Sequence, residues 1–281
     1  MTTRLIINAD DYGRSPGISR GIRHAHLHGI VTSTTCMMNM PSVADEIQIA
    51  LRETPHLGLG VHLVITAGKP LLRDSKIAGL TRPDGNFLNK SEFIERVQDL
   101  QPASIKAEWR AQIETFIKTA GKKPSHLDSH HHSSYFSPAL LTAFFELARE
   151  YDLPMRLPLA HSYPAGGENP EAVGIPEELE EQMNEFAPQI LEEFQPRSPD
   201  AFFASFFGNQ ATRGELIKIM GHFLPRGTFE IMCHPGYIDE TFARESTYTY
   251  QREEELNILT DPAMRKEIQK RGIELISFEQ L

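Results

Sequence analysis

The sequence predicts an α/β fold, specifically a distorted TIM-like (β/α) barrel. Three observations support this prediction. Short apolar, β-branched segments alternate with segments of helical period along most of the 281 residues. About eight segments have strand character, which is the strand number of a barrel. Four of these segments run into Asp or His residues at their ends, and parallel strands deliver such residues to one edge of a sheet. We expect residues 1–281 to form a single domain.

The first half of the chain contains four expected strand and helix pairs. A strand is expected from about residue 4 to the Asp10-Asp11 pair, and Ser15 followed by Pro16 supplies an N-cap oxygen and a first-turn proline for the next helix. Residues 66–89 are expected to form a long excursion. The other expected strands are 33–38, 57–65 and 126–129, and the expected helices are 18–29, 42–52, 105–117 and 138–150.

The regular alternation lapses in the second half, after a short expected strand at 155–157. An inserted segment near 162–199 follows, which begins with Gly, Pro and Asn residues and continues as an acidic helix at 176–194. We expect this segment to be a lid or a substrate wall over the site. The alternation then resumes, with expected strands at 201–207, 228–233 and 273–278 and helical sequence at 212–223 and 250–270.

Composition narrows the class of protein. The 28 Lys and Arg residues are outnumbered by 38 Asp and Glu residues, so the formal charge of −10 opposes binding to nucleic acid. The sequence has no apolar run long enough to span a bilayer and no recognisable signal peptide, so we expect a cytoplasmic protein without membrane insertion. Cys36 and Cys233 each lie in an apolar segment and are expected to be reduced core residues.

The ends of the strands suggest a catalytic metal site. Asp11 follows the first strand, His62 lies in the third, and His130 ends the expected fourth strand. Two imidazoles and one carboxylate leave coordination positions open, which is typical of catalytic rather than structural sites. The donors suit Zn²⁺, and also Mn²⁺, Co²⁺ or Mg²⁺.

The run from His126 to His132 contains further candidates. Asp128 is expected on the same strand face as His130 and could orient a ligand histidine from behind. His131 and His132 are interpreted either as substrate contacts or as structural loop residues. The last of the four strand-end groups contains a single histidine, His234, which follows the strand 228–233.

At these positions the chain resembles the YdjC-like carbohydrate deacetylase family. The matching blocks, in the order of the family, are Asn8 to Gly13, Gly29 to Thr35, Gly60 to Leu63, Lys123 to His132 and Met232 to Pro235. The resemblance implies a barrel that removes an N-acetyl group from an amino sugar, such as a chito-oligosaccharide or a related glycan. It also implies one divalent ion, Mg²⁺ or Zn²⁺, held by Asp11, His62 and His130, and a homodimer is common among such proteins. Ser133-Ser134 stands where family members often carry another histidine.

The expected chemistry is amide hydrolysis, which needs an activated water and a proton donor. We predict Asp10 as the base and His234, as an imidazolium, as the acid. Arg156 could fix the charge of Asp10, contact the substrate or form a plain salt bridge. The candidates for substrate contact are Asp128, His131, His132 and Arg156. A metal-dependent phosphoesterase and a non-catalytic sugar-binding protein remain alternatives.

Overall fold

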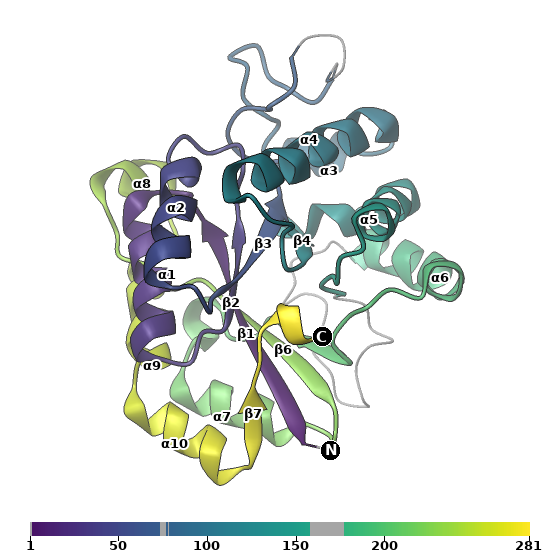
Figure 1. Ribbon diagram of the computed structural model, residues 1–281. Coiled ribbons are helices and arrows are strands. Elements are labelled where there is room, and N and C mark those ends of the chain that lie inside the picture. The colour runs from purple at the N-terminus through teal and green to yellow at the C-terminus, as the bar shows by residue number, and fades with distance from the viewer. Residues whose placement is uncertain (1, 74–76, 78, 158–176) are drawn as a thin grey trace.

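A parallel β-sheet forms the centre of the molecule. The computed structural model describes residues 2–73, 77, 79–157 and 177–281 (Figure 1). Its seven strands are β1 (Thr3–Tyr12), β2 (Ser33–Cys36), β3 (Gly58–Leu63), β4 (Leu127–Ser129), β5 (Ala201–Phe203), β6 (Thr228–Cys233) and β7 (Ile273–Leu275). The strand order is β4-β3-β2-β1-β6-β5, and β7 also pairs with β1. Among the described residues no ladder joins β4 to β5, so the expected α/β barrel is confirmed in a distorted, open form.

Strand β1 is the central strand of this sheet, because it pairs with three other strands. Its apolar run Leu5–Ile7 is completely buried, which favours a central position. One edge pairs with β6 from Arg4 to Ala9. The other edge pairs with β7 near its start and with β2 from Asn8 onward. The carboxyl end of β1 therefore lies in the middle of the sheet's carboxyl edge.

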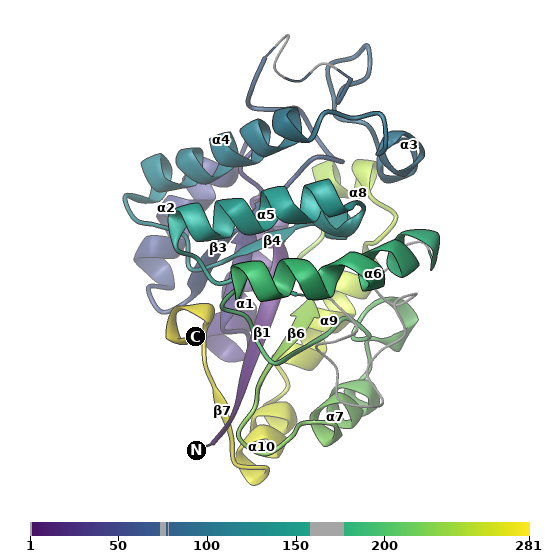
Figure 2. The same cartoon turned by 90° about the vertical axis from the view of Figure 1, so that its right-hand side faces the viewer.

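Helices cover the outside of the sheet (Figure 1). They are α1 (Pro16–His28), α2 (Val43–Glu53), α3 (Lys90–Arg96), α4 (Pro102–Ala120), α5 (Pro138–Tyr151), α6 (Glu177–Phe194), α7 (Arg213–Gly221), α8 (Glu240–Glu245), α9 (Tyr250–Leu259) and α10 (Pro262–Lys270). Figure 2 shows α4, α5 and α6 side by side as one layer, in which α5 packs against both neighbours. Short 3₁₀ turns follow β4 (His130–Tyr135), precede α7 (Gly208–Gln210) and end the chain (Phe278–Gln280).

Local signals place several helix ends as expected. The Ser15 side chain accepts a hydrogen bond from the backbone N–H of Ile18, so the predicted N-cap of α1 is confirmed. Gly121 ends α4 at φ 68°, in the left-handed region that glycine adopts without a steric cost. Gly60 in β3 has another role: a Cβ there would lie 2.5 Å from the His126 ring. Glycine therefore permits β3 to lie directly against that ring.

Three expectations need correction. The expected strand at 155–157 is a single isolated bridge between Met155 and Leu127. The helical sequence 250–270 is two helices, because Pro262 begins α10 behind the N-cap Asp261. In the inserted segment, α6 packs on α5 as an outer-layer helix. None of its described residues lines the cavity of about 960 Å³ that lies at the carboxyl edge of the sheet. The rest of the expected lid, up to residue 176, lies outside the described residues.

The core is apolar and continuous. Trp109 and Phe116 of α4 and Phe144 of α5 are completely buried within it. Cys36 and Cys233 are buried and free of any disulfide, as expected. In the part of the chain that the structure describes, every helix is too short or too polar to cross a lipid bilayer.

Candidate metal centre and catalytic site

An irregularity at the end of β1 brings both aspartates to the same cavity. The β1–β2 register shifts between Ala9 and Tyr12, and Asp11 has φ 72°. Adjacent residues of a regular strand point to opposite faces. The shift and the left-handed backbone of Asp11 remove this constraint, so Asp10 and Asp11 both line the cavity. A left-handed non-glycine residue costs about 1–3 kcal/mol, and such residues cluster at functional sites.

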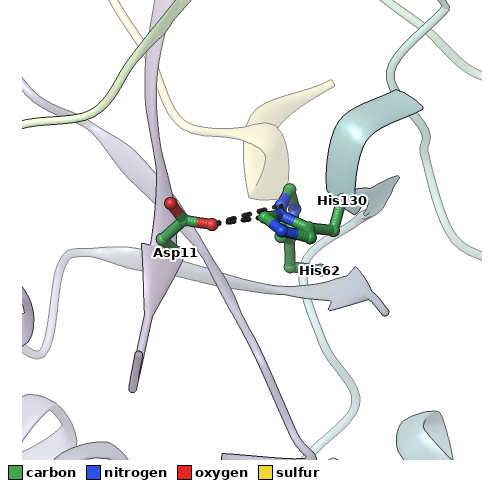
Figure 3. Close-up of side chains that lie close together, drawn as sticks. All are labelled: Asp11, His62 and His130. Carbon is green, nitrogen blue, oxygen red and sulfur yellow. Dashed lines mark hydrogen bonds and ion pairs between the residues drawn. The ribbon is translucent and has the colours of Figure 1, made fainter. Parts of the chain in front are cut away.

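Asp11, His62 and His130 all line this cavity. Figure 3 shows their side chains close together, with Asp11 facing the two imidazole rings. Asp11 Oδ1 lies 3.5 Å from His62 Nε2 and 3.3 Å from His130 Nδ1, and the two nitrogens are 3.2 Å apart. Asp11 comes from β1, His62 from β3, and His130 from the turn after β4. All three side chains are largely buried, and Asp11 Oδ1 has no hydrogen-bond donor.

This arrangement fits a metal ion. Donors about 2.0–2.1 Å from a tetrahedral Zn²⁺ lie about 3.3 Å from one another, whereas neighbouring donors around an octahedral Mg²⁺ lie about 2.9 Å apart. The observed separations of 3.2–3.5 Å are closer to the tetrahedral spacing. Asp11 Oδ1 is a second sign, because this buried oxygen accepts no hydrogen bond of normal geometry and faces the two histidine nitrogens, whereas buried polar atoms normally have a hydrogen-bond partner.

Asp128 holds the His62 ring from behind. Its Oδ1 lies 2.7 Å from His62 Nδ1, and its Oδ2 accepts a hydrogen bond from Thr35 Oγ1 at 3.0 Å. This leaves His62 Nε2 facing Asp11. Burial lowers the pKa of His62, but the surrounding carboxylates, Asp128 first and then Asp10 and Asp11, together raise it to about 9. In the metal-free protein His62 is therefore protonated, and a metal ion would replace that proton.

Arg156 organises the carboxylates under the cavity. It is completely buried, and its NH1 and NH2 each donate to one oxygen of Asp10 at 2.7 Å. NH1 also lies 3.0 Å from Asp128, and Nε donates to Glu230 at 2.8 Å. Asp10, His62 and Asp128 form a second possible ligand group, but both of its carboxylates are already ion-paired with the Arg156 guanidinium. The first group is therefore the better metal site.

Asp10 is held ionised by its surroundings. Burial raises the pKa of Asp10, and the charge and hydrogen bonds of Arg156 lower it, with a net value well below the usual range. Its Oδ1 accepts from Asn8 as well as from Arg156. Its Oδ2 accepts only from Arg156 and lies 4.0 Å from His234 Nε2. Oδ2 is therefore the oxygen of Asp10 with capacity to accept a proton.

His234 follows β6 and faces Asp10 across this gap. Its backbone N–H donates to Glu255 of α9, which also accepts from the Tyr248 hydroxyl. Burial lowers the pKa of His234 to about 4, although Asp10 opposes the effect. The ring is therefore neutral at neutral pH, and the predicted imidazolium is not its resting form.

Arg252 of α9 is a site residue that the sequence reasoning missed. It is buried, and its NH2 donates to Asp11 Oδ2. Its guanidinium lies 4.9 Å from the Phe242 ring and 5.5 Å from the Tyr248 ring. Burial raises the pKa of Asp11, and Arg252 contributes most to lowering it well below its usual range. Arg252 thus occupies one oxygen of Asp11 and leaves Oδ1 for the histidines.

The predicted substrate contacts divide into two pairs. His131 and His132, at φ 56° and 55°, both line the cavity. His131 Nδ1 is 3.0 Å from Thr66 Oγ1, and the His132 ring packs edge-on against Phe202. Asp128 and Arg156 are fully buried and do not line the cavity. Neither is placed to touch a substrate, because their polar groups are engaged with Asp10, His62 and each other.

The cavity has a volume of about 960 Å³ and lies at the carboxyl edge of the sheet. A match to the family model described as YdjC-like protein covers residues 4–270. The chain belongs to the YdjC-like protein family.

Relatives of this YdjC-like protein match over the whole chain. A carbohydrate deacetylase of Geobacillus stearothermophilus is 34% identical, over 100% of this chain and 98% of the relative. A carbohydrate deacetylase of Halalkalibacterium halodurans is 36% identical, over 92% of this chain and 95% of the relative.

Solved structures agree on the fold. A crystal structure of an Enterococcus faecalis V583 protein superposes with a TM-score of 0.85 at 31% identity, covering 100% of this chain and 99% of the other. A family 4 carbohydrate esterase from Streptomyces lividans, in complex with acetate, superposes with a TM-score of 0.50 at 9% identity, covering 98% and 91%. The second likeness concerns the fold alone and supports the barrel-like architecture.

Several residues around the YdjC-like site lacked a usable sequence signal. Glu230 is the exception, because a charged residue inside the apolar strand 228–233 is unusual and could have drawn attention. Arg252 and Glu255 lie on a helix with many charged residues, where two buried ones do not stand out.

Proposed function

We propose that this YdjC-like protein is a metal-dependent hydrolase that removes an N-acetyl group from an amino sugar, in a chito-oligosaccharide or a related N-acetylated glycan. The observation that carries the proposal is the convergence of Asp11 Oδ1, His62 Nε2 and His130 Nδ1 within 3.5 Å of one another at the cavity floor. The carbohydrate deacetylases among its relatives support the reaction type.

One divalent ion is held by Asp11, His62 and His130. Zn²⁺ suits the two nitrogen donors and their spacing, and Mg²⁺ is the alternative. When bound, such an ion supplies Lewis acidity, which polarises a carbonyl oxygen and makes water more acidic. Asp128 keeps the His62 ring in place, and Arg252 keeps Asp11 turned toward the histidines.

Asp10 and His234 move the protons of the reaction. Asp10 Oδ2 accepts a proton from the water whose oxygen attacks the acetyl carbon. His234 delivers a proton to the sugar nitrogen as the C–N bond breaks, so one water and one amide become acetic acid and a free amine, which are acetate and an ammonium ion after proton exchange at neutral pH. Because His234 rests in the neutral form, it must be charged in each turnover, and the proton on Asp10, 4.0 Å away, is the nearest source.

The cavity wall supplies the remaining roles. His131 and His132 are proposed to contact the substrate, since both line the cavity beside His130. Arg156 acts through Asp10, whose carboxylate it holds in one orientation by two hydrogen bonds. A cytoplasmic location and assembly into a homodimer stay predictions.

The test is a product screen on the purified protein. Its metal content is measured first, and acetate release is then followed on diacetylchitobiose and a panel of N-acetylated sugars, with and without chelator. We expect equal amounts of acetate and free amine, loss of both with chelator, and recovery when metal is returned. Release of phosphate from sugar phosphates without acetate would make the protein a phosphoesterase, and binding without any product would make it a sugar-binding protein.

The Asp10→Asn variant separates proton transfer from metal binding. With its oxygen at the Oδ1 position, the amide can still accept from Asn8 and from Arg156 NH2, but it loses the bond from Arg156 NH1 and is a far weaker base than the carboxylate. We expect one metal ion per chain as in the native protein, with kcat lower by roughly 10²–10⁴-fold. Native turnover in this variant would exclude Asp10 as the base.

A further inference from the structure

Two aromatic rings form an exposed stack on one wall of the cavity. Phe207, which follows β5, and Tyr248, which precedes α9, have ring centroids 4.5 Å apart and planes within 4° of parallel. Both residues line the cavity. Phe207 is nevertheless 41% exposed, one of four large apolar side chains among the described residues with such exposure. An apolar ring left open at a cavity wall suggests a ligand surface.

The stack is fixed in position. The Tyr248 hydroxyl donates to Glu255 and accepts a hydrogen bond from the backbone N–H of Gly208 at 2.8 Å, next to Phe207 in the chain. The Arg252 guanidinium lies 5.5 Å from the Tyr248 ring. The position of Phe207 is therefore tied to α9, and a ligand that uses its face meets a preorganised surface.

Among the described residues, the only aromatic ring stacked on a face of Phe207 is that of Tyr248. His234 lies 5.3 Å from the Phe207 centroid and 6.0 Å from the Tyr248 centroid, and its ring is steeply inclined to both. Since the two stacked rings are 4.5 Å apart, these distances place His234 beside the stack. A ring on the outer face of Phe207 would lie much farther from Tyr248. His234 also approaches Asp10, at 4.0 Å, so a single imidazole links the stack to the catalytic centre.

Polar side chains line the cavity close in sequence to the two stacked rings. Asn209, Gln210, Ser246 and Thr247 all line the cavity on the same two segments as Phe207 and Tyr248. A pyranose ring matches a surface with both aromatic and polar groups, because its faces carry C–H groups and its rim carries hydroxyls. Stacking removes the apolar face from water and makes weak C–H contacts with the ring, while amides and hydroxyls bind the rim.

We propose that Phe207, backed by Tyr248, is the platform for a second pyranose ring, the neighbour of the sugar that is deacetylated. The inference rests on the proposed function and deepens it. The acetamido group must reach Asp11, His62 and His130, so the sugar that carries it occupies the metal side of His234, and the platform serves the adjoining unit. The cavity volume of about 960 Å³ is at the upper end for small-molecule sites and accommodates two rings. The platform therefore favours substrates of at least two sugar units over a single sugar.

The experiment compares Phe207→Ala, Phe207→Leu and Phe207→Trp with the native enzyme. The measured quantity is the ratio of kcat/KM for diacetylchitobiose to kcat/KM for N-acetylglucosamine. Loss of the flat ring in the Ala and Leu variants should lower this ratio about tenfold, and Trp should restore it. Leu224→Ala, which removes another exposed apolar side chain away from the cavity, is the matched control and should not change the ratio. An unchanged ratio in both the Ala and Leu variants would overturn the platform.

A binding measurement separates this inference from the proposed function. Titration of the metal-free protein with diacetylchitobiose needs no turnover. We expect the dissociation constant to rise about tenfold in Phe207→Ala and to recover in Phe207→Trp. If the native protein releases no acetate but shows this pattern, the proposed function fails and the platform stands. If acetate is released and binding of the disaccharide is unaffected by Phe207→Ala, the platform fails alone.

Discussion

The two sides of the cavity are built in different ways. On one side, His62 and His130 stand at the ends of neighbouring strands, and buried polar side chains fix the His62 ring. On the other side, His234 and Arg252 depend on α9 and on the loop that carries Tyr248. In the proposed mechanism, the strand side supplies the donor atoms for an ion, whereas the α9 side supplies His234 for proton transfer and the Arg252 cation beside Asp11. The comparison suggests that metal binding and proton transfer can be altered separately.

Removal of a ligand on the strand side should have the largest effect. We expect His62→Ala to lose metal and activity together, by more than the roughly 10–100-fold that loss of an outer-shell partner costs. The reason is that one of the three donors proposed among the described residues disappears. Metal content and acetate release are measured on the same sample, with the surface variant His222→Ala as the control. A variant that kept full metal occupancy would place the ion elsewhere.

Substitution on the α9 side should spare the metal. We expect His234→Gln to retain one ion per chain while kcat on N-acetylated sugars falls by roughly 10²–10⁴-fold. Activated acetyl esters have leaving groups that need little protonation, so their hydrolysis should fall much less. The two substrate types are compared on one preparation. Equal losses on both would mean that His234 is structural and that the two sides do not divide the chemistry.

The same division explains what could be predicted from sequence. The strands and their terminal Asp and His residues carry short-range signals, because apolar periodicity and position in the chain place them at one edge. The convergence of Asp11, His62 and His130 could be inferred in this way. Arg252 could not, because its contact with Asp11 joins residues 241 positions apart and depends on how α9 packs. Similarly, the length of Leu127–Ser129 and the single bridge at Met155 depend on tertiary pairing that local propensity does not determine.

Substitution of Arg252, whose guanidinium contacts Asp11 between the two sides of the cavity, should have a smaller effect. In the metal-free protein, Arg252→Met leaves the buried Asp11 carboxylate without its cation, which costs about 3 kcal/mol. We expect Tm to fall by roughly 5–10 °C. A metal ion would then compensate for that charge, so the rise in Tm on adding metal should be larger than in the native protein. Arg252→Lys keeps the charge and is the matched control. An equal metal-induced rise in Arg252→Met and native protein would mean that Arg252 does not act through Asp11.

The smallest expected effect concerns His126, a completely buried residue directly before β4. Its ring stacks on Phe278 at 3.7 Å, and burial, with a contribution from Arg156, holds its pKa well below the usual value of 6.5. The unfolded chain therefore binds a proton below pH 6.5 that the native state excludes, and the free energy of unfolding decreases as pH falls. The loss from this one group is at most about 2 kcal/mol at pH 5.

His126→Gln removes this titration, so the free energy of unfolding of the metal-free variant should fall less between pH 7.5 and 5 than that of the native protein. Denaturant unfolding at several pH values measures the slope, and a constant offset from lost stacking does not affect it. His222→Gln, at an exposed position, is the comparison variant. If His126→Gln lost as much stability on acidification as the native protein, the acid sensitivity would have to come from other buried histidines, such as His132, whose pKa burial also lowers.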